Sequence, residues 1–244
     1  MRMVMIIFKM FFNTIIYTIK MNKMGLDSKY SDKDCYDYLR KAVLEVNRKG
    51  NVLIETTGVE NIPKENGFIF FPNHQGLYDA LGIIETCENP ISVVIKKELS
   101  NTVIVKQVVA CLRGQFIDRK DPRDGLRVIK QMAEDVKNGR NYIVFAEGTR
   151  TKVHNVPQEF HPGTFKSAVY AKCPIVPVAL IDTYKPFDEK SIKKVKVYVH
   201  YLKPIIYEEY KDLKTKEIAE IVKSRIEEDI NSFLLSNAEI AQKY

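Results

Sequence analysis

Short apolar runs alternate with stretches of helical periodicity along most of the chain, and no other feature limits its folds as strongly. The expected strands cover residues 52–55, 68–71, 91–95, 116–118, 142–145, 175–180 and 194–200. The expected helices cover residues 31–50, 79–86, 103–112, 122–139, 164–172 and 215–235. Strands that alternate with helices favour a largely parallel sheet with helices on both faces. The sequence therefore predicts an α/β fold with a mostly parallel mixed sheet flanked by helices, in a single domain of residues 25–244.

The end of the chain shows a different pattern from the middle. Residues 194–200 alternate strictly between polar and apolar side chains, which is typical of a strand with one exposed face, so we expect a half-exposed strand near an edge of the sheet. The last helix, 215–235, is charged and amphipathic, and we expect it to pack on the surface of the domain.

Cysteines and histidines are spaced too widely for a metal site or a compact disulfide framework. The cysteines are Cys35, Cys87, Cys111 and Cys173, and the histidines are His74, His154, His161 and His200. The sequence therefore predicts reduced thiols and no bound metal.

The first 24 residues are both basic and strongly apolar. They contain Arg2, Lys9, Lys20 and Lys23 and no acidic residue, and they supply more than half of the net charge of +7. On a single helix, Arg2, Lys9, Asn13 and Lys20 fall in one narrow stripe, and the rest of the circumference is mostly apolar. Lys9 and Asn13 interrupt what would otherwise be a membrane span, and the segment lacks the cleavage site of a signal peptide.

We interpret residues 1–24 as an amphipathic helix that anchors the chain on a membrane surface, with the basic stripe toward anionic headgroups. The alternative is a helix that packs on the protein's own core. The basic residues alternate with large aliphatic ones and form no aromatic and basic platform, so we do not expect nucleic acid as a partner.

A histidine and an aspartate follow the apolar run 68–71, where that strand is expected to end. His74 and Asp79 are five residues apart, so on a continuous helix their side chains would point about 140° away from each other. A direct contact requires a turn, which Gly76 makes easy. A carboxylate that holds a neutral imidazole lets the ring accept a proton from a hydroxyl. The alternative is that His74 caps the strand and Asp79 caps the next helix.

The run Glu147, Gly148, Thr149, Arg150 and Thr151 follows another expected strand. Glycine lets a ligand approach the backbone, hydroxyl groups donate hydrogen bonds, and a guanidinium group binds phosphate through two parallel bonds. The run therefore indicates a phosphate site. A surface turn closed by an ion pair between Glu147 and Arg150 is the alternative, and a P-loop is excluded because its sequence pattern is absent.

Further polar side chains lie at expected strand ends. Lys96 and Lys97 end one strand, and Asp118 and Arg119 end another. Ligands of such sheets bind beyond the carboxyl ends of the strands. We therefore expect these residues near His74, with Arg119 as a second phosphate contact.

Four blocks within residues 72–178 resemble those of the phospholipid/glycerol acyltransferase family. Residues 73–79 match its N-H-x4-D block, and residues 114–119 match its second block. Residues 145–151, FAEGTRT, are similar to its F-P-E-G-T-R-S block, and residues 174–178 to its proline-centred fourth block. The resemblance is greatest to the members that acylate 1-acyl-sn-glycerol 3-phosphate.

This resemblance implies an acyl transfer from a thioester of acyl carrier protein or coenzyme A to the free hydroxyl of lysophosphatidic acid, with no cofactor and no metal. It implies His74 as the base and Asp79 as its orienting partner. The residues assigned to the glycerol phosphate are Arg119, Glu147, Gly148, Thr149 and Arg150. Further substrate or donor contacts are assigned to Asn73, Lys96, Lys97, Thr151 and Pro177.

An enzyme of this kind would work on membrane lipids, so we expect the segment 1–24 to anchor it at the cytoplasmic face of the cell membrane. Three other interpretations remain open at this stage. The acceptor could be glycerol 3-phosphate, another lysophospholipid or an amino-acid lipid. The histidine and aspartate could instead serve a hydrolase, or the chain could be a catalytically silent lipid-binding module.

Overall fold

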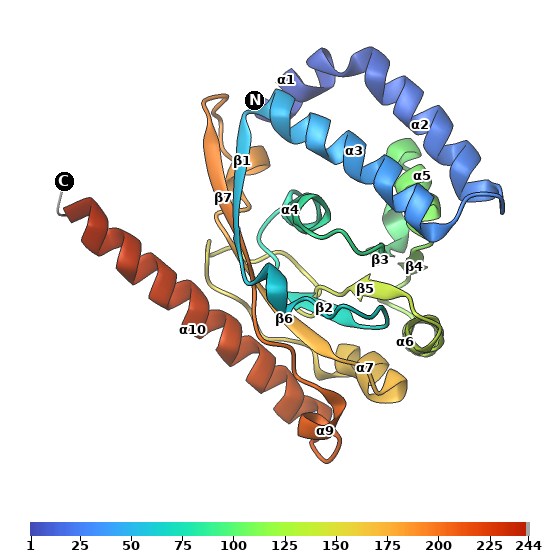
Figure 1. Ribbon diagram of the computed structural model, residues 1–244, viewed down its shortest axis with the longest axis vertical. Coiled ribbons are helices and arrows are strands. Elements are labelled where there is room, and N and C mark those ends of the chain that lie inside the picture. The colour runs from blue at the N-terminus through green and yellow to red at the C-terminus, as the bar shows by residue number, and fades with distance from the viewer. Residues whose placement is uncertain (243–244) are drawn as a thin grey trace.

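The computed structural model describes residues 1–242, and within them seven strands form one sheet (Figure 1). The strands are β1 (Val52–Thr57), β2 (Ile69–Pro72), β3 (Ile91–Lys96), β4 (Gln115–Ile117), β5 (Asn141–Ile143), β6 (Ile175–Ile181) and β7 (Val195–Tyr201). Their order across the sheet is β1-β7-β6-β2-β5-β3-β4. Strands β6, β2, β5, β3 and β4 run parallel to one another, whereas β7 is antiparallel to β6 and parallel to β1. The mostly parallel mixed sheet is confirmed.

Helices cover both faces of this sheet. They are α1 (Arg2–Lys9), α2 (Phe11–Leu26), α3 (Asp32–Gly50), α4 (Asp79–Thr86), α5 (Val103–Cys111), α6 (Pro122–Lys137), α7 (Lys166–Ala171), α8 (Lys185–Asp188), α9 (Tyr207–Tyr210) and α10 (Thr215–Gln242). Short 3-10 turns cover Val59–Asn61, Lys97–Leu99 and Pro162–Phe165. Helices α2 to α5 lie on one side of the sheet and α6, α7 and α10 on the other (Figure 1).

The apolar run around β2 explains how the two layers are held together. Phe68 and Phe70 are fully buried in the core beneath α2 to α5, and Ile69 and Phe71 are fully buried in the core beneath α6, α7 and α10. Side chains of a strand alternate between the two faces of a sheet, so a strand covered on both sides must be apolar at every position. The prediction of a buried strand at this place is confirmed.

Helix starts follow the expected local chemistry. Ser31 caps α3 by accepting from the Asp34 N–H at 3.1 Å, and the Asp34 carboxylate accepts from the Ser31 N–H at 2.9 Å. This reciprocal pair is the capping box that the sequence predicts. Helix α4 has the predicted bounds. The predicted helix 164–172 begins instead with the 3-10 turn Pro162–Phe165 and continues as α7.

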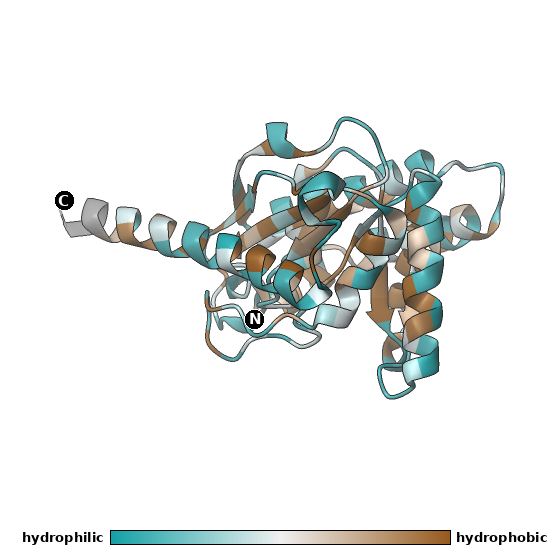
Figure 2. Ribbon diagram, turned by 90° about the horizontal axis from the view of Figure 1, so that it is seen from below, coloured by the Kyte–Doolittle hydropathy of each residue, from teal (hydrophilic) through white to brown (hydrophobic). Residues whose placement is uncertain are grey.

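The expectation of a half-exposed strand at residues 194–200 is only partly right. Strand β7 is second from the edge of the sheet, and Lys196 is its one exposed residue. Helix α10 covers the outer face, where the Phe233 ring packs on Tyr198 and His200. Helix α10 also continues past the predicted end at residue 235, and it extends beyond the body of the domain (Figure 2).

Residues 1–24 form a bent pair of helices, which corrects the expectation of a single helix. Helices α1 and α2 meet at Met10 with an angle of 76°. No single helix in the described residues is long and apolar enough to cross a membrane; among them, only α1 and α2 taken together have the length and composition of a span. Met21 and Met24 are buried in the core, so the segment is continuous with the domain that follows it.

The polar stripe of this segment faces the protein, which is the reverse of the prediction. Asn13 Nδ2 donates to Glu45 Oε1 at 2.7 Å, Lys9 Nζ to the Lys49 carbonyl at 3.3 Å, and Lys20 lies over the Tyr38 ring. The opposite side, here called the outer apolar face, consists of exposed Val4, Ile7, Phe8, Phe11, Phe12, Ile15, Ile16 and Ile19. The expectation that the stripe points toward headgroups is therefore wrong, because its members bind α3 and its surroundings.

Candidate active site

The carboxyl ends of the parallel strands bring the predicted polar residues to one edge of the sheet. His74 follows β2, Glu147 follows β5 and Arg119 follows β4, and these strands belong to the parallel part of the sheet. Backbone contacts join the segments directly, since the Thr151 N–H donates to the His74 carbonyl at 2.8 Å. The structure thus brings the separate motifs to one edge of the sheet, and their action as one site stays a prediction.

His74 and Asp79 are in direct contact. His74 Nδ1 lies 2.7 Å from Asp79 Oδ2, and the same oxygen accepts from the Gln75 N–H at 2.7 Å and the Gly76 N–H at 3.0 Å. Asp79 is completely buried. It is the first residue of α4, whose N-cap Tyr78 makes no side-chain cap bond, so Asp79 binds the preceding turn and does not cap the helix. The helix-cap alternative is thereby excluded.

Gly76 makes this turn possible by its lack of a side chain. A Cβ atom at this position would lie 2.9 Å from Tyr184 Cα and 3.3 Å from the Thr183 carbonyl oxygen. Any larger residue would have to push the backbone of residues 183–184 away. The turn at Gly76 and the backbone of residues 183–184 are therefore tightly packed against each other.

The contact with Asp79 decides which histidine nitrogen is available for chemistry. An ionised carboxylate only accepts hydrogen bonds, so Nδ1 carries the proton and Nε2 keeps its lone pair. The ring stacks on Phe145 with its centroid 4.2 Å away, and the side chain is one-fifth exposed. The histidine is thus held in one tautomer and one orientation, with access from solvent, as a general base requires.

Glu147 lies beneath the site. Its Oε1 accepts from the His74 N–H at 2.7 Å, and its Oε2 accepts from Gln158 Nε2 at 3.1 Å. The residue is 3% exposed, and burial raises the pKa of its carboxyl group. Both oxygens are occupied by protein donors, so this geometry gives Glu147 a positioning role toward His74. The direct phosphate contact assigned to it remains a prediction without geometric support.

Gln158 is a residue that the sequence analysis missed. Its Nε2 donates both to Glu147 and to the Thr149 carbonyl, the latter at 3.0 Å. Gln158 therefore links Glu147 and Thr149 and stabilises the loop after β5. A glutamine in a polar stretch of a loop has no pattern that would have distinguished it.

The loop after Glu147 is open toward solvent and lies beside Arg119. Gly148 has a φ of 70°, which lets the chain turn, and its N–H donates to the Phe145 carbonyl at 3.1 Å. Arg119 donates to the Gly148 carbonyl, and Thr149 and Arg150 are exposed. Within residues 1–242, Glu147 and Arg150 form no ion pair, so the alternative of a turn closed by that pair is wrong. The arrangement leaves Arg150 and Thr149 available for an anionic group.

Three of the other residues that were assigned to substrate or donor contacts make structural contacts within the protein. Asn73 joins β2 to β6, because its Nδ2 donates to the Leu180 carbonyl at 3.0 Å and its Oδ1 accepts from the Leu180 N–H at 2.7 Å. Pro177 is buried within β6 opposite Phe71. The Thr151 hydroxyl donates to the Val153 carbonyl at 3.0 Å. The polar groups of Asn73 and Thr151 bind within the protein and Pro177 is buried, which favours a structural role for all three.

Lys96 and Lys97 lie exposed at the rim of this edge. Lys96 Nζ is 3.1 Å from Glu98, and Lys97 Nζ is 3.4 Å from Asp118. Exposed pairs of this kind open at little cost in free energy. Both amino groups are therefore accessible, and a contact with donor or substrate stays a prediction.

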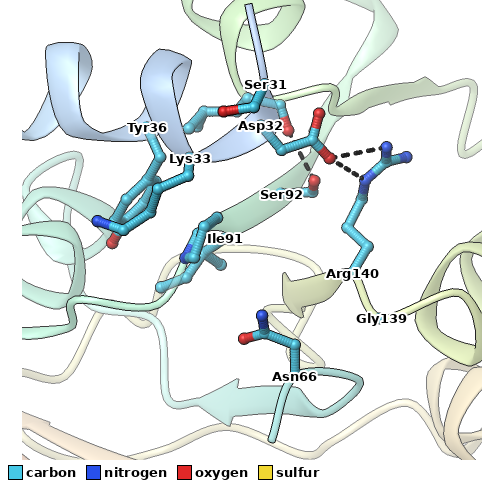
Figure 3. Close-up of a pocket in the computed structure, with 11 residues that line it drawn as sticks. Ser31, Asp32, Lys33, Tyr36, Asn66, Ile91, Ser92, Gly139 and Arg140 are labelled. Carbon is cyan, nitrogen blue, oxygen red and sulfur yellow. Dashed lines mark hydrogen bonds and ion pairs between the residues drawn. The ribbon is translucent and has the colours of Figure 1, made fainter.

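A separate hollow lies at the amino ends of the strands (Figure 3). Its lining includes Asp32, Ile91, Ser92 and Arg140. Arg140 pairs with Asp32 at 2.9 Å, and the Ser92 hydroxyl donates to the Leu112 carbonyl at 2.6 Å. These polar groups bind one another, so the hollow has the character of a structural network and is distinct from the site around His74.

In the part of the chain that the structure describes, no three histidine, cysteine, aspartate or glutamate side chains are arranged to hold a metal ion. The reaction implied by the resemblance needs none, and the expectation that no metal and no cofactor takes part stays a prediction.

A comparison with protein families matches residues 53–181, more than half of the chain, to the model described as Acyltransferase. The chain belongs to the acyltransferase family. The matched region spans β1 to β6 and includes His74, Asp79 and the Glu147 loop. The family resemblance drawn from the sequence blocks is confirmed.

Several relatives of this chain carry the name 1-acyl-sn-glycerol-3-phosphate acyltransferase. The chain is 29% identical over 151 residues to 1-acyl-sn-glycerol-3-phosphate acyltransferase of Borreliella burgdorferi, covering 61% of this chain and 60% of that protein. It is 30% identical over 160 residues to the probable enzyme of that name from Mycoplasma genitalium, covering 60% of this chain and 58% of the relative. The chain thus spans about 60% of the length of these curated relatives.

A crystal structure from Thermotoga maritima shares the fold of this acyltransferase family member. It is described as the 1-acyl-sn-glycerophosphate acyltransferase PlsC, and it matches with a TM-score of 0.75 and 22% identity. The match covers 96% of this chain and 98% of that chain. The α/β fold is therefore one that a solved acyltransferase also adopts.

Proposed function

We propose that this protein transfers a fatty acyl group from an acyl thioester to the free hydroxyl of 1-acyl-sn-glycerol 3-phosphate, which gives phosphatidic acid. The observation that carries the proposal is the contact of 2.7 Å between His74 Nδ1 and Asp79 Oδ2, next to an open loop with an exposed arginine. The names of the relatives from Borreliella burgdorferi and Mycoplasma genitalium support this acceptor.

The chemistry requires one base and no covalent enzyme intermediate. His74 Nε2 takes the proton of the acceptor hydroxyl while the oxygen attacks the thioester carbonyl. The tetrahedral intermediate then collapses, the carbon–sulfur bond breaks, and the imidazolium returns its proton to the leaving thiolate. Asp79 stabilises the imidazolium and keeps the ring in the productive tautomer. General base catalysis of this kind contributes typically about 10²–10⁴-fold to the rate.

The phosphate of the acceptor binds at the loop after β5 in this proposal. Arg150 and Thr149 are exposed there, and Arg119 is bonded to the adjacent Gly148 carbonyl. A guanidinium group and backbone N–H groups are suited to a phosphate dianion. The donor is a thioester of acyl carrier protein or of coenzyme A, and both would leave as the thiol.

The lipid acceptor resides in a membrane, and the outer apolar face of α1 and α2 supports binding to one. That face exposes large side chains such as Phe8 and Phe12, which are 86% and 77% exposed. Apolar helical faces of this kind bury themselves at the boundary of headgroups and acyl chains. We place the protein at the cytoplasmic face of the cell membrane, where the net charge of +7 of the whole chain favours anionic lipids.

The test is an acceptor panel with the purified protein and one acyl donor. The acceptors are lysophosphatidic acid, glycerol 3-phosphate, other lysophospholipids and an amino-acid lipid, and the products are read by mass spectrometry. We expect phosphatidic acid to dominate. A preference for another acceptor would contradict the assigned substrate, and release of free fatty acid without any transfer would show a hydrolase. The His74→Ala variant serves as the control for contaminating activity.

A further inference from the structure

Arg2 is the most deeply buried cationic side chain that the structure describes. It is 1% exposed, although it lies at the start of α1, and its guanidinium group donates to backbone carbonyls far along the chain. The acceptors are Pro186 at 3.0 Å, Lys185 at 3.4 Å and Lys193 at 2.5 Å. A buried arginine loses much hydration energy, and the three carbonyls that its Nη1 and Nη2 atoms bind offset part of this cost. The position of the Arg2 side chain therefore depends on the segment that supplies these carbonyls.

The carbonyls that Arg2 binds belong to the connection between β6 and β7, residues 182–194, here called the β6–β7 connection. Lys185 and Pro186 begin α8, whereas Lys193 lies just before β7. One guanidinium group thus bridges the outgoing and the returning arm of the connection.

The β6–β7 connection packs directly on the turn that carries the catalytic pair. Tyr184 touches Gly76, where a Cβ atom would approach Tyr184 Cα to 2.9 Å. The Phe187 ring meets the Tyr78 ring edge-on at 5.5 Å between centroids. Gly76 and Tyr78 lie between His74 and Asp79, so a displacement of the connection would move the base relative to its partner.

Helix α1 connects this arrangement to the outer surface. Arg2 and Ile6 point into the protein, while Val4, Ile7 and Phe8 belong to the outer apolar face. One short helix therefore holds the β6–β7 connection with its inner side and presents apolar side chains to the surroundings with its outer side.

We propose that Arg2 is a positioning residue that transmits the seating of α1 to the turn of His74 and Asp79. Binding of the outer apolar face to a lipid surface holds α1 in place, Arg2 then holds the β6–β7 connection, and the connection holds Gly76 and Tyr78. This inference rests on the proposed function, and it adds that catalysis depends on a residue that touches neither substrate nor the reacting atoms.

The test compares kcat for transfer to lysophosphatidic acid in vesicles, using the full chain. Arg2→Ala is expected to lower kcat about 10²-fold, the loss that a displacement of ~1 Å at a catalytic centre can cause. The acceptor KM and the co-sedimentation with vesicles should stay as in the wild type. Arg2→Lys keeps the charge but reaches fewer carbonyls, so its kcat should lie between the two.

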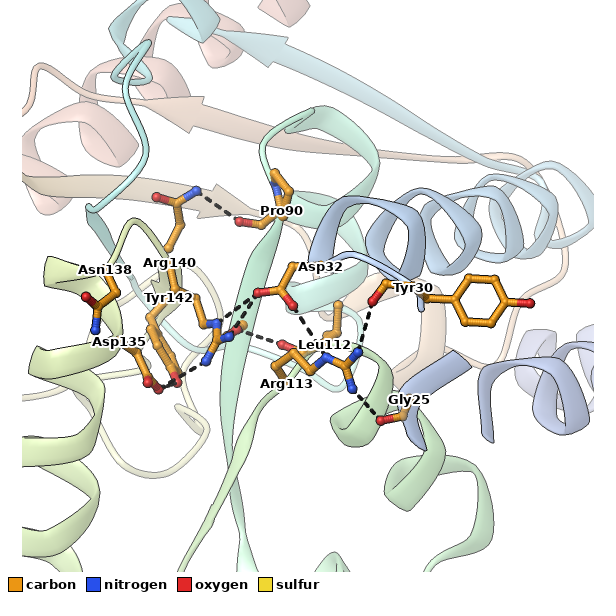
Figure 4. A network of polar contacts seen from close by, with 12 residues as sticks. Gly25, Tyr30, Asp32, Pro90, Leu112, Arg113, Asp135, Asn138, Arg140 and Tyr142 are labelled. Carbon is orange, nitrogen blue, oxygen red and sulfur yellow. Dashed lines mark hydrogen bonds and ion pairs between the residues drawn. The ribbon is translucent and has the colours of Figure 1, made fainter. Parts of the chain in front are cut away.

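Arg113, which follows the C-cap of α5, offers a matched control (Figure 4). Its guanidinium group also donates to backbone carbonyls, those of Gly25 and Tyr30, and it pairs with Asp32. These contacts secure the far end of α2 away from the catalytic turn. Arg113→Ala should therefore lower the thermal stability and leave kcat near the wild-type value.

A second measurement does not depend on activity. Amide hydrogen exchange in residues 74–79 and 183–187 should rise in Arg2→Ala and stay unchanged in Arg113→Ala. If Arg2→Ala fails to fold, Arg2→Lys and Phe187→Leu carry the same test, since Phe187→Leu breaks the contact with Tyr78 from the other side.

The proposal is overturned if Arg2→Ala retains wild-type kcat, or if Arg113→Ala lowers kcat equally. Unfolding of Arg2→Lys would also count against it, because Arg2 would then be a general determinant of the fold. A wild-type protein that transfers no acyl group refutes the proposed function instead. In that case hydrogen exchange alone decides whether Arg2 controls the turn.

Discussion

Replacing Asp79 by asparagine tests the role of the carboxylate with little change in shape. The amide oxygen can still accept from the Gln75 and Gly76 N–H groups and from His74, which now bind Asp79 Oδ2 at 2.7 to 3.0 Å. The turn should therefore persist, and the change removes mainly the negative charge. That charge acts on the imidazolium that forms when His74 takes the proton.

The size of the effect follows from the geometry. Two unit charges about 4 Å apart interact by about 4 kcal/mol at an effective dielectric constant of about 20. Asp79 is fully buried, so solvent screens this interaction little. Since about 1.4 kcal/mol corresponds to a tenfold change in rate, we expect kcat of Asp79→Asn to fall about 10³-fold.

The assay is acyl transfer at saturating donor and lysophosphatidic acid, with thermal unfolding measured on the same preparations. A second pair of the same geometry provides the control, because His200 Nδ1 lies 2.7 Å from Asp229 Oδ2 between β7 and α10. Asp229→Asn should change stability and leave kcat unchanged. A folded Asp79→Asn protein with kcat within tenfold of the wild type would refute the assignment of Asp79 as the partner of the base.

Three further predictions concern the loop, the buried acid and the outer apolar face. Arg150→Ala should raise the acceptor KM about 10–100-fold at saturating donor, which corresponds to the loss of a charge-assisted hydrogen bond worth ~1.5–3 kcal/mol; a change in donor KM alone would instead assign the loop to the thioester carrier. Burial raises the pKa of the Glu147 carboxyl above its ordinary value, so the contribution of Glu147 to stability is greatest at low pH and declines as the pH rises through the raised pKa. In urea unfolding, the difference in unfolding free energy between Glu147→Gln and wild type should therefore shift in favour of the variant with rising pH. A difference that does not change with pH would contradict the raised pKa. Phe8→Glu with Phe12→Glu should release the protein from vesicles without lowering its melting temperature, because both rings are exposed; retained sedimentation would mean that another surface binds the membrane.

The parts of this fold that depend on local patterns were predictable from the sequence. The apolar run before His74 specified a buried strand, and Gly76 indicated the turn that brings Asp79 back to the imidazole. Both features depend on neighbours close in the chain. The sharing of one site by His74 and the Glu147 loop was predictable as well, because carboxyl ends of parallel strands meet at one edge.

The roles of Glu147 and Arg2 could not be predicted in the same way. Glu147 is occupied by the His74 N–H, 73 residues away, and by Gln158, and nothing in the motif distinguishes a buried acid from an exposed one. Arg2 binds carbonyls more than 180 residues away. A polar stripe on an apolar helix fits contact with headgroups or with the protein equally well, and only the packing of α1 and α2 on α3 decides between them.

The central claim is that His74 is the base of an acyl transfer to lysophosphatidic acid. Its most direct test is the rate of phosphatidic acid formation by wild type and His74→Ala at saturating donor and acceptor, together with binding of lysophosphatidic acid to both. We expect transfer by the wild type, a loss of at least about 10²-fold in the variant and similar binding in both. Transfer by a folded His74→Ala protein at a rate near that of the wild type would contradict it.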